Sequence, residues 1–196
     1  MIKRECDNHF GSHYDRVYVA LFKHFEEAQK IKPGDKILET TSGTAGYSFA
    51  GIGRVLGYNC HVVIPKGVDN AIIRLIQGEE ATLYFTPEQD YIAGFPAFLR
   101  DFLPKHRAEF TFLNHSMGKR SGPAFTNNEV TLSALGKIGE EISAQINVDY
   151  FIPAVGNGSS ILGPARALSE STVVIAFESF QSAVAYDLKY LGKYCR

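Results

Sequence analysis

The sequence contains few cysteines and no long apolar run, and these absences exclude several classes of protein. Its three cysteines, Cys6, Cys60 and Cys195, are an odd number and lie far apart, so we expect no disulfide framework. No cysteine and histidine residues have the close spacing of a zinc site, and we predict no metal. The first residues, MIKRECDNHF, are charged, and no stretch of about 18 apolar residues follows. We therefore expect no signal peptide and no membrane span, and a cytoplasmic location.

The sequence also lacks an excess of either charge. Twenty Lys and Arg residues stand against 21 Asp and Glu residues, which gives a net charge of -1. Such a chain has no basic field to neutralise a row of phosphates, so we do not expect nucleic acid as a partner. With 196 residues, 45% hydrophobic and 21% charged, the composition is typical of one large folded domain or two small ones.

Short apolar runs alternate with helical patterns along most of the sequence. The runs with the length and composition of buried β-strands are residues 36–40, 61–65, 81–85, 110–114, 150–155 and 172–178. A helical pattern follows Ser12, which with Asp15 resembles a capping box, and its expected apolar stripe is Val17, Leu21, Phe25 and Ala28. Further helical patterns cover residues 45–56, 70–77, 91–103, 128–145 and 160–168. Because parallel strands need crossover connections, this alternation predicts an α/β fold with parallel sheets covered by helices. Residues 104–127 are the least patterned, and we expect a domain connection or a mobile loop there.

A loop rich in glycine and serine follows the expected strand 150–155. It consists of Gly156, Asn157, Gly158, Ser159 and Ser160. Backbone amides at the start of a helix have no partner within the helix, so this loop is suited to bind phosphate. It is not a Walker A loop, because no Gly-Lys-Ser/Thr follows. Gly156, Gly158 and the downstream Glu178 leave a Rossmann-like nucleotide site as an alternative, with Ile161 in place of the third glycine.

A second loop of small residues follows the expected strand 36–40. It consists of Thr41, Ser42, Gly43, Thr44, Ala45 and Gly46. The loop offers hydroxyl groups and amides at the start of a helix but has no basic residue. It is therefore suited to a carboxylate or another small anion.

The two loops are similar, in order and spacing, to two motifs of one enzyme family. Residues 39–46, ETTSGTAG, resemble the E-P-T-S-G-N-T-G loop that grips the substrate carboxylate, and residues 154–163, AVGNGSSILG, resemble the G-V-G-T-G-G-T-I-T-G phosphate cradle. The chain thus resembles the fold-type-II, tryptophan synthase β-like enzymes that use pyridoxal phosphate (PLP), and within them most closely cysteine synthase.

This resemblance implies a fold, a domain division and two sets of binding residues. It implies the PLP fold type II architecture, with a smaller α/β subdomain over residues 39–125 and a larger PLP-phosphate-binding domain made of residues 1–38 and 126–196. The implied cofactor-binding residues are Gly156, Asn157, Gly158, Ser159, Ser160 and Thr44. The implied substrate-binding residues are Thr41, Ser42, Gly43, Thr44 and Ala45. Because family members are longer at both ends, we expect the larger domain to be incomplete.

The resemblance breaks at the catalytic lysine. The family motif N-P-x-G-S-x-K-D-R matches residues 8–16, NHFGSHYDR, so Tyr14 occupies the position of the lysine that forms the Schiff base. A phenol has no amine to condense with an aldehyde. Thr44 also replaces the asparagine that the resemblance places against the cofactor. His9, His13 and His115 lie in segments that border this site, and we expect them to be solvated or core histidines.

The sequence therefore predicts a degenerate, cysteine-synthase-like protein with no catalytic residue for this chemistry. It is expected to bind a small anion, phosphate, an amino acid or a protein partner, and to hold PLP, if at all, without an internal aldimine. One alternative is an active PLP-dependent lyase or transferase of small amino acids, completed by residues outside this chain. The other is the Rossmann-like nucleotide-binding protein. We expect a homo-oligomer or a protein partner that completes the larger domain.

Overall fold

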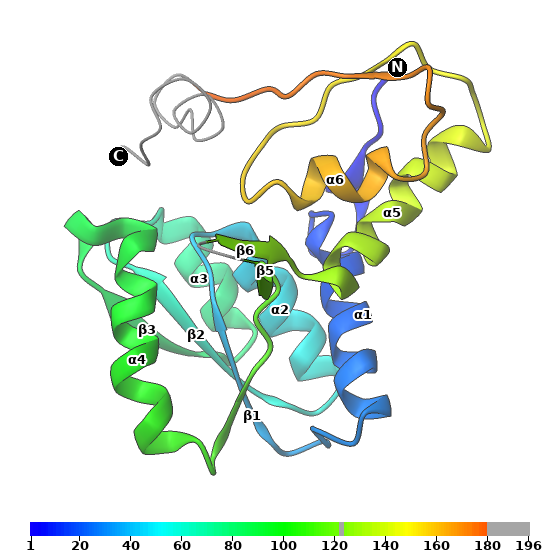
Figure 1. Cartoon of the computed structure of the whole chain (residues 1–196). Helices are drawn as coiled ribbons and strands as arrows, with labels where there is room; N and C mark the ends of the chain where they lie inside the picture. Colours follow the sequence, from blue (N-terminus) through cyan, green and yellow to red (C-terminus); the bar gives the residue numbers. More distant parts are fainter. Residues whose placement is uncertain (122–123, 180–196) are drawn as a thin grey trace. The chain divides into compact units, whose positions relative to one another are not determined.

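The computed structural model of the chain describes residues 1–121 and 124–179 and contains two compact units (Figure 1). The first unit is Met1–His115 and the second is Ser116–Arg196. In the first unit, α1 (Tyr14–Glu27) packs on α2 (Thr44–Val55). The smaller subdomain was expected to begin at residue 39, so a helix from before this boundary contacts a helix from after it. That residues 1–38 and 126–196 form one larger domain stays a prediction.

A parallel sheet of β1, β2, β3 and β4 forms the centre of the first unit. β1 (Lys36–Thr40) lies between β2 (Asn59–Pro65) and β4 (Phe110–Phe112), and β3 (Thr82–Thr86) pairs with the other edge of β2. The order is therefore β3-β2-β1-β4. The chain leaves β1 toward β2 and returns to the other side of β1 only at β4, so the direction of winding changes there. Ligands of open α/β sheets bind at the carboxyl ends of strands at such a point.

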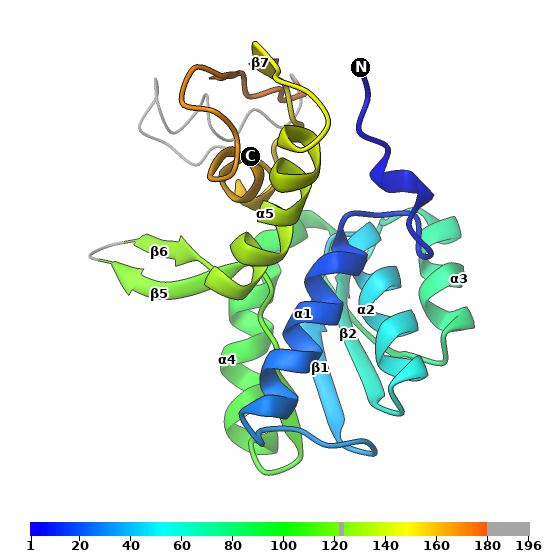
Figure 2. The same cartoon turned by 90° about the vertical axis from the view of Figure 1, so that its right-hand side faces the viewer.

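Helices cover both faces of this sheet (Figure 2). α1 and α2, together with α3 (Asn70–Gly78), lie on one face, and α4 (Gly94–His106) lies on the other. Short 3-10 helices, η1 (Glu5–Asp7) and η2 (Glu88–Ala93), precede α1 and α4. Ile37 and Leu38 are adjacent in β1, so their side chains point to opposite faces, and both are fully buried. Burial on both faces explains why the strand sequences are apolar without alternation.

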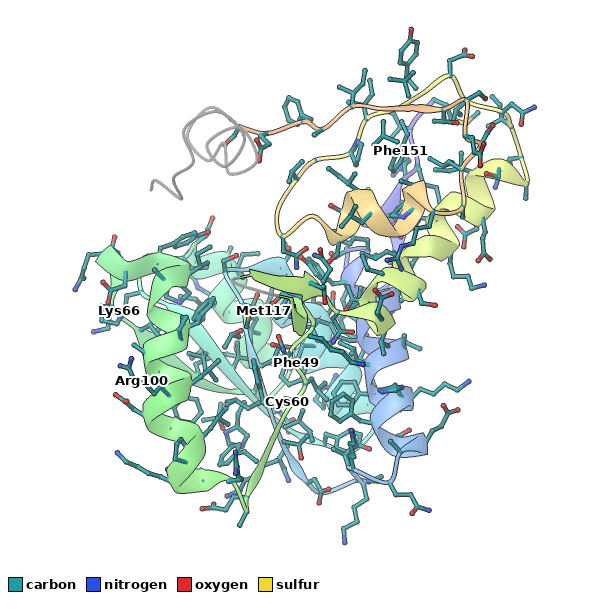
Figure 3. The ribbon with its side chains drawn as sticks, in the orientation of Figure 1. Phe49, Cys60, Lys66, Arg100, Met117 and Phe151 are labelled. Carbon is teal, nitrogen blue, oxygen red and sulfur yellow. The ribbon has the colours of Figure 1, made fainter. Side chains whose placement is uncertain are left out.

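The layer between the sheet, α1 and α2 is rich in aromatic side chains. Phe22 stacks on Phe49 with 5.8 Å between ring centroids and on Tyr58 at 5.0 Å. Phe49 and Cys60 lie inside this unit (Figure 3). A Cβ at Gly53 would come within 2.1 Å of the Cys60 sulfur, so glycine lets α2 approach β2. The apolar side chains of this unit with no exposed surface are Val17, Tyr18, Leu21, Phe22, Ile37, Leu38, Phe49, Ala50, Val62, Val63, Ile64 and Ile76.

The second unit combines two packed helices with two small strand pairs. α5 (Glu129–Ser143) packs closely on α6 (Ser159–Ala165), because Gly139 lets the Pro164 carbonyl approach and Gly163 lets Leu135 approach. β5 (Met117–Ser121) and β6 (Ala124–Asn127) form an antiparallel pair. β7 (Tyr150–Phe151) and β8 (Val173–Val174) are parallel, and a bridge from Ala154 to Phe177 extends them.

The predicted α/β class is confirmed, and each predicted strand and helix has a counterpart; strand 36–40 has the predicted bounds, and the ends of the others are shifted. The main error concerns residues 104–127, which we expected to be a domain connection or a mobile loop. β4 corresponds to the predicted strand 110–114, and the boundary between the two units follows His115, but α4 continues to His106 and β5 and β6 form a hairpin that was not predicted. The hairpin strands are polar and glycine-containing, so they lack the apolar alternation by which strands are recognised.

The expected capping box at the start of α1 differs in its contacts. The Ser12 hydroxyl accepts a hydrogen bond from the Tyr14 amide at 3.2 Å, and the Asp15 carboxylate accepts one from the Phe10 amide at 2.7 Å. In a capping box the two side chains bond each other's amides. Here the acidic residue reaches further back and fixes the preceding turn.

No helix within residues 1–121 and 124–179 is long and apolar enough to cross a membrane. In the same residues, no group of three or more His, Cys, Asp and Glu side chains is placed to hold a metal ion. Cys6 and Cys60 are free thiols, and Cys195 lies outside the described residues. Burial raises the pKa of the Cys60 thiol to about 12, so it is not a reactive thiolate.

Candidate functional site

The first predicted loop joins β1 to α2 at the point where the sheet order reverses. Thr41 is buried, and its hydroxyl accepts a hydrogen bond from the Gly43 amide at 3.0 Å. This hydrogen bond stabilises the turn that leads from β1 into α2. Among the described residues, the amides of Ser42, Thr44 and Ala45 make no hydrogen bond. Amides at a helix start carry partial positive charge, so this loop can bind an anion.

The start of α1 is held firmly against α2. The Asp15 carboxylate accepts hydrogen bonds from the Ser48 hydroxyl at 2.6 Å and from the Phe10 amide at 2.7 Å. The Phe10 ring lies edge-on to Tyr47 at 5.2 Å and occupies the space that a Cβ at Gly51 would need. The turn that carries Tyr14 is therefore fixed in place through both polar and aromatic contacts.

A buried polar cluster lies at the carboxyl ends of β1 and β4. Glu39 has no exposed surface, and its carboxylate accepts hydrogen bonds from the amides of Thr40 at 2.8 Å and His115 at 3.0 Å. The Nδ1 atom of His115 lies 3.2 Å from the same carboxylate and 3.1 Å from the Tyr18 hydroxyl. Burial, followed by the charge of Glu39, raises the pKa of Tyr18 far above its ordinary value. Tyr18 therefore remains a hydrogen-bond donor.

Tyr14 lies beside this cluster. Its ring is 4.4 Å from the ring of His13, 5.4 Å from that of His115 and 6.4 Å from that of Tyr18. Burial and the nearby charge of Glu39 raise the pKa of Tyr14, so its phenol is protonated at neutral pH. Burial also lowers the pKa of His13, which favours the neutral imidazole.

The second predicted loop connects the end of β7 to α6 in the other unit. The Asn157 side chain accepts a hydrogen bond from the Ser159 amide at 3.0 Å, and the Ser160 hydroxyl donates to the Ala154 carbonyl at 2.9 Å. The Asn127 side-chain amide donates to the Asn157 carbonyl at 2.8 Å and to the Ser159 hydroxyl at 3.0 Å. The loop thus uses several of its own polar groups to hold its shape.

Other amides of this loop remain available. Gly156, Asn157, Gly158 and Ser160 have backbone amides that make no hydrogen bond to any described residue. Gly158 has φ +87°, a left-handed conformation that glycine adopts without strain. A Cβ at Gly156 would meet no atom within 4 Å, so the backbone is open to an approaching group. These amides can bind phosphate.

The structure places the predicted residues in two separate sets. Tyr14 and the loop of Thr41, Ser42, Gly43, Thr44 and Ala45 belong to the first unit, and the loop of Gly156, Asn157, Gly158, Ser159 and Ser160 belongs to the second. The assigned binding roles stay predictions. The buried hydrogen bonds of Glu39 and His115 were missed, because 76 residues separate the two in the sequence. The one sequence signal for this cluster was Glu39, a charged residue near the end of the apolar strand 36–40. The expectation of a core histidine is confirmed for His115, which is 6% exposed.

Comparisons with known proteins agree with this arrangement of elements. The family described as "Pyridoxal-phosphate dependent enzyme" matches residues 1–193. Cysteine synthase from Aquifex aeolicus is 25% identical over 169 residues, which cover 85% of this chain and 49% of that protein. Cystathionine beta-synthase from Rattus norvegicus is 28% identical over 178 residues, covering 87% of this chain and 29% of that protein. The chain therefore spans about half the length of the cysteine synthases that it matches.

Solved structures show the same fold. A hydrogen sulfide-producing enzyme from Fusobacterium nucleatum superposes with a TM-score of 0.82 at 24% identity, over 93% of this chain and 59% of that one. O-acetyl serine sulfhydrylase isoform 3 from Entamoeba histolytica gives 0.78 at 24% identity, over 93% of this chain and 53% of that one. The PLP fold-type-II architecture is thus confirmed, and the chain belongs to the pyridoxal-phosphate-dependent enzyme family and resembles cysteine synthase.

Proposed function

We propose that this chain is a cysteine-synthase-like protein that binds small anions and does not form a Schiff base with PLP. The observation that carries the proposal is Tyr14, a protonated phenol at the position where the resemblance places the lysine. The turn around Tyr14 is held by Asp15, and the two loops retain amides suited to anions. Each loop therefore keeps amides that could bind an anion, while residues 8–16 contain no lysine to react with an aldehyde.

The second unit has groups that suit the phosphate of PLP, whereas position 14 in the first unit has no amine to react with the aldehyde. Four backbone amides, of Gly156, Asn157, Gly158 and Ser160, suit the phosphate group. PLP supplies an aldehyde that reacts with amines, and Tyr14 offers none. The chain would therefore hold this cofactor only through non-covalent contacts, and free phosphate satisfies the same amides.

The active-enzyme alternative needs a lysine from outside this chain, or from another segment, to supply the amine. The Rossmann-like alternative is less well supported, because the match to the pyridoxal-phosphate-dependent family covers residues 1–193, a range that includes the loop at Gly156. Glu178, which that alternative needs at a strand end, follows the isolated bridge at Phe177 and lies outside any strand.

We predict that phosphate protects the protein against unfolding through the loop at Gly158. Phosphate at ten times its dissociation constant would add about 1.4 kcal/mol to the free energy of unfolding. The substitution Gly158→Val should abolish this protection, because a β-branched side chain disfavours φ +87° and blocks approach to the amides. Thermal unfolding at increasing phosphate, against sodium chloride of equal ionic strength, measures the effect.

Gly34→Val is the matched control for backbone strain. Gly34 has φ +93° and no atom within 4 Å of its ideal Cβ, but it lies in the first unit, away from the loop. This variant should lose stability as Gly158→Val does and still respond to phosphate. Equal phosphate protection in the parent and in Gly158→Val would contradict the assignment of the loop as an anion site.

We further propose that the chain self-associates or binds a protein partner through the second unit. Isolated pairs of strands are marginally stable, and β7 and β8 expose large side chains with apolar surface. Tyr150 of β7 is 62% exposed, and Val173 of β8 is 51% exposed. Sedimentation velocity over a dilution series should show mass above that of one chain at the higher concentrations. A single species of 21.7 kDa at all concentrations would contradict self-association.

A further inference from the structure

Asn157 is the one asparagine in the sequence that is followed by glycine. In such a pair, the backbone nitrogen of the glycine can attack the side-chain carbonyl carbon of the asparagine, because glycine has no Cβ to obstruct the approach. The pair lies in the loop between β7 and α6, and Asn157 is exposed. The loop therefore holds both reactants of a deamidation reaction.

The attacking nitrogen belongs to Gly158 and is not engaged elsewhere. The Gly158 amide makes no hydrogen bond to any residue that the structure describes. The carbonyl oxygen of the same peptide group, on Asn157, accepts a hydrogen bond from the Asn127 side chain at 2.8 Å. This donor stabilises the negative charge that spreads over the peptide group when the nitrogen loses its proton. The contact thus favours the reactive form of the Gly158 nitrogen.

The side chain of Asn157 is held against the backbone that follows it. Its carbonyl oxygen accepts a hydrogen bond from the amide of Ser159, the residue after Gly158, at 3.0 Å. This hydrogen bond polarises the carbonyl group and makes its carbon more susceptible to attack. The side-chain nitrogen of Asn157, which has to leave, makes no hydrogen bond within the described part of the chain.

We propose that Asn157 is a site of spontaneous deamidation. The Gly158 nitrogen loses its proton to a base in the solvent and forms a bond to the side-chain carbon of Asn157. The bond from that carbon to the side-chain nitrogen breaks, and ammonia leaves with a proton from water. A second water molecule opens the resulting five-membered imide at either carbonyl group, which yields aspartate or isoaspartate.

Both products change the loop of residues 156–160. Aspartate adds a negative charge beside the amides that we propose for phosphate, and isoaspartate also lengthens the backbone by one carbon atom. The new carboxylate repels an anion, so deamidation removes the affinity of this loop for phosphate and does so irreversibly. This consequence rests on the proposed anion-binding function, whereas the reaction at Asn157 does not.

The reaction is tested by incubating the full chain at mildly alkaline pH, with a parallel sample in urea. Proteolytic digestion and mass spectrometry at successive times measure aspartate and isoaspartate at position 157. Asn147 is the internal control, because it is exposed in the same unit but is followed by Val148, whose β-branched side chain obstructs the backbone nitrogen.

Asn157 should be converted in the folded chain at a rate comparable to that in urea, while Asn147 keeps its amide. Conversion of Asn157 in urea alone would overturn the inference, because the folded loop would then protect it. Conversion of Asn147 as fast as that of Asn157 in the folded chain would overturn it as well.

The consequence for phosphate is tested with Asn157→Asp. This variant carries the deamidated side chain and keeps an oxygen acceptor for the Ser159 amide. In thermal unfolding it should bind phosphate about tenfold more weakly than the parent, because of the like charge in the loop. Asn147→Asp adds the same charge outside the loop and should keep the parent's affinity.

Equal phosphate affinity of the parent and Asn157→Asp would overturn the loss of affinity on deamidation. Absence of phosphate protection in the parent would contradict the proposed anion-binding function of this loop together with that consequence. The measured conversion of Asn157 would still decide the modification itself.

Discussion

Tyr14→Lys should gain a covalent adduct with PLP that the parent lacks. The new amine would stand at the start of α1, in a turn fixed by Asp15, and partial burial favours its neutral, nucleophilic form. After incubation with PLP and reduction with borohydride, peptide mapping should show labelling at position 14 that approaches one per chain. The parent should show weak labelling scattered over surface lysines.

Val19→Lys provides the matched control. Val19 is on the same helix and is 56% exposed, so a lysine there has an ordinary pKa and no fixed surroundings. The lysine introduced at position 19 should be labelled by PLP no more than the other surface lysines. If the parent itself gives a stoichiometric adduct at one peptide, another lysine supplies the amine and the active-enzyme alternative is correct. If Tyr14→Lys folds and labels only as Val19→Lys does, position 14 is not the cofactor-facing position that the resemblance implies.

The local parts of this fold were predictable because local sequence patterns determine them. The strand 36–40 and the helix that follows have bounds close to those expected, since an apolar run and a small-residue loop mark them. The burial of α1 was predicted less well. Val17 and Leu21 of the expected apolar stripe are fully buried, but Phe25 is partly exposed and Ala28 is exposed. Tyr18 and Phe22 are fully buried as well, because Phe49 on α2 and Tyr58 contact these two rings.

The candidate site was predictable only in its loops. A loop of small residues between a strand and a helix has a sequence signature, and both loops start helices as expected. The cluster of Glu39, His115 and Tyr18 has no such signature, because it depends on the pairing of β1 with β4. The tertiary fold alone makes the glutamate a hydrogen-bond acceptor for a residue near the end of another strand.

That buried glutamate carries the last prediction. Glu39→Ala should destabilise the first unit by several kcal/mol, because each buried hydrogen-bond donor left without an acceptor costs about 1–3 kcal/mol. The substitution removes the acceptor of the buried amides of Thr40 and His115 and of the His115 imidazole. Urea unfolding followed by tyrosine fluorescence should show a much lower midpoint.

Two further variants separate the contributions of charge and hydrogen bonding. Glu39→Gln keeps one acceptor oxygen but directs an amide donor toward groups that also donate, so its midpoint should fall between those of the parent and Glu39→Ala. Glu109→Ala removes an exposed carboxylate that lies 3.2 Å from the Lys36 amine, and its midpoint should stay close to the parent's. A urea midpoint for Glu39→Ala as high as that for Glu109→Ala would mean that water replaces the carboxylate as the acceptor for the amides of Thr40 and His115. The hydrogen bonds of Glu39 would then not be what joins the end of β1 to the residues after β4.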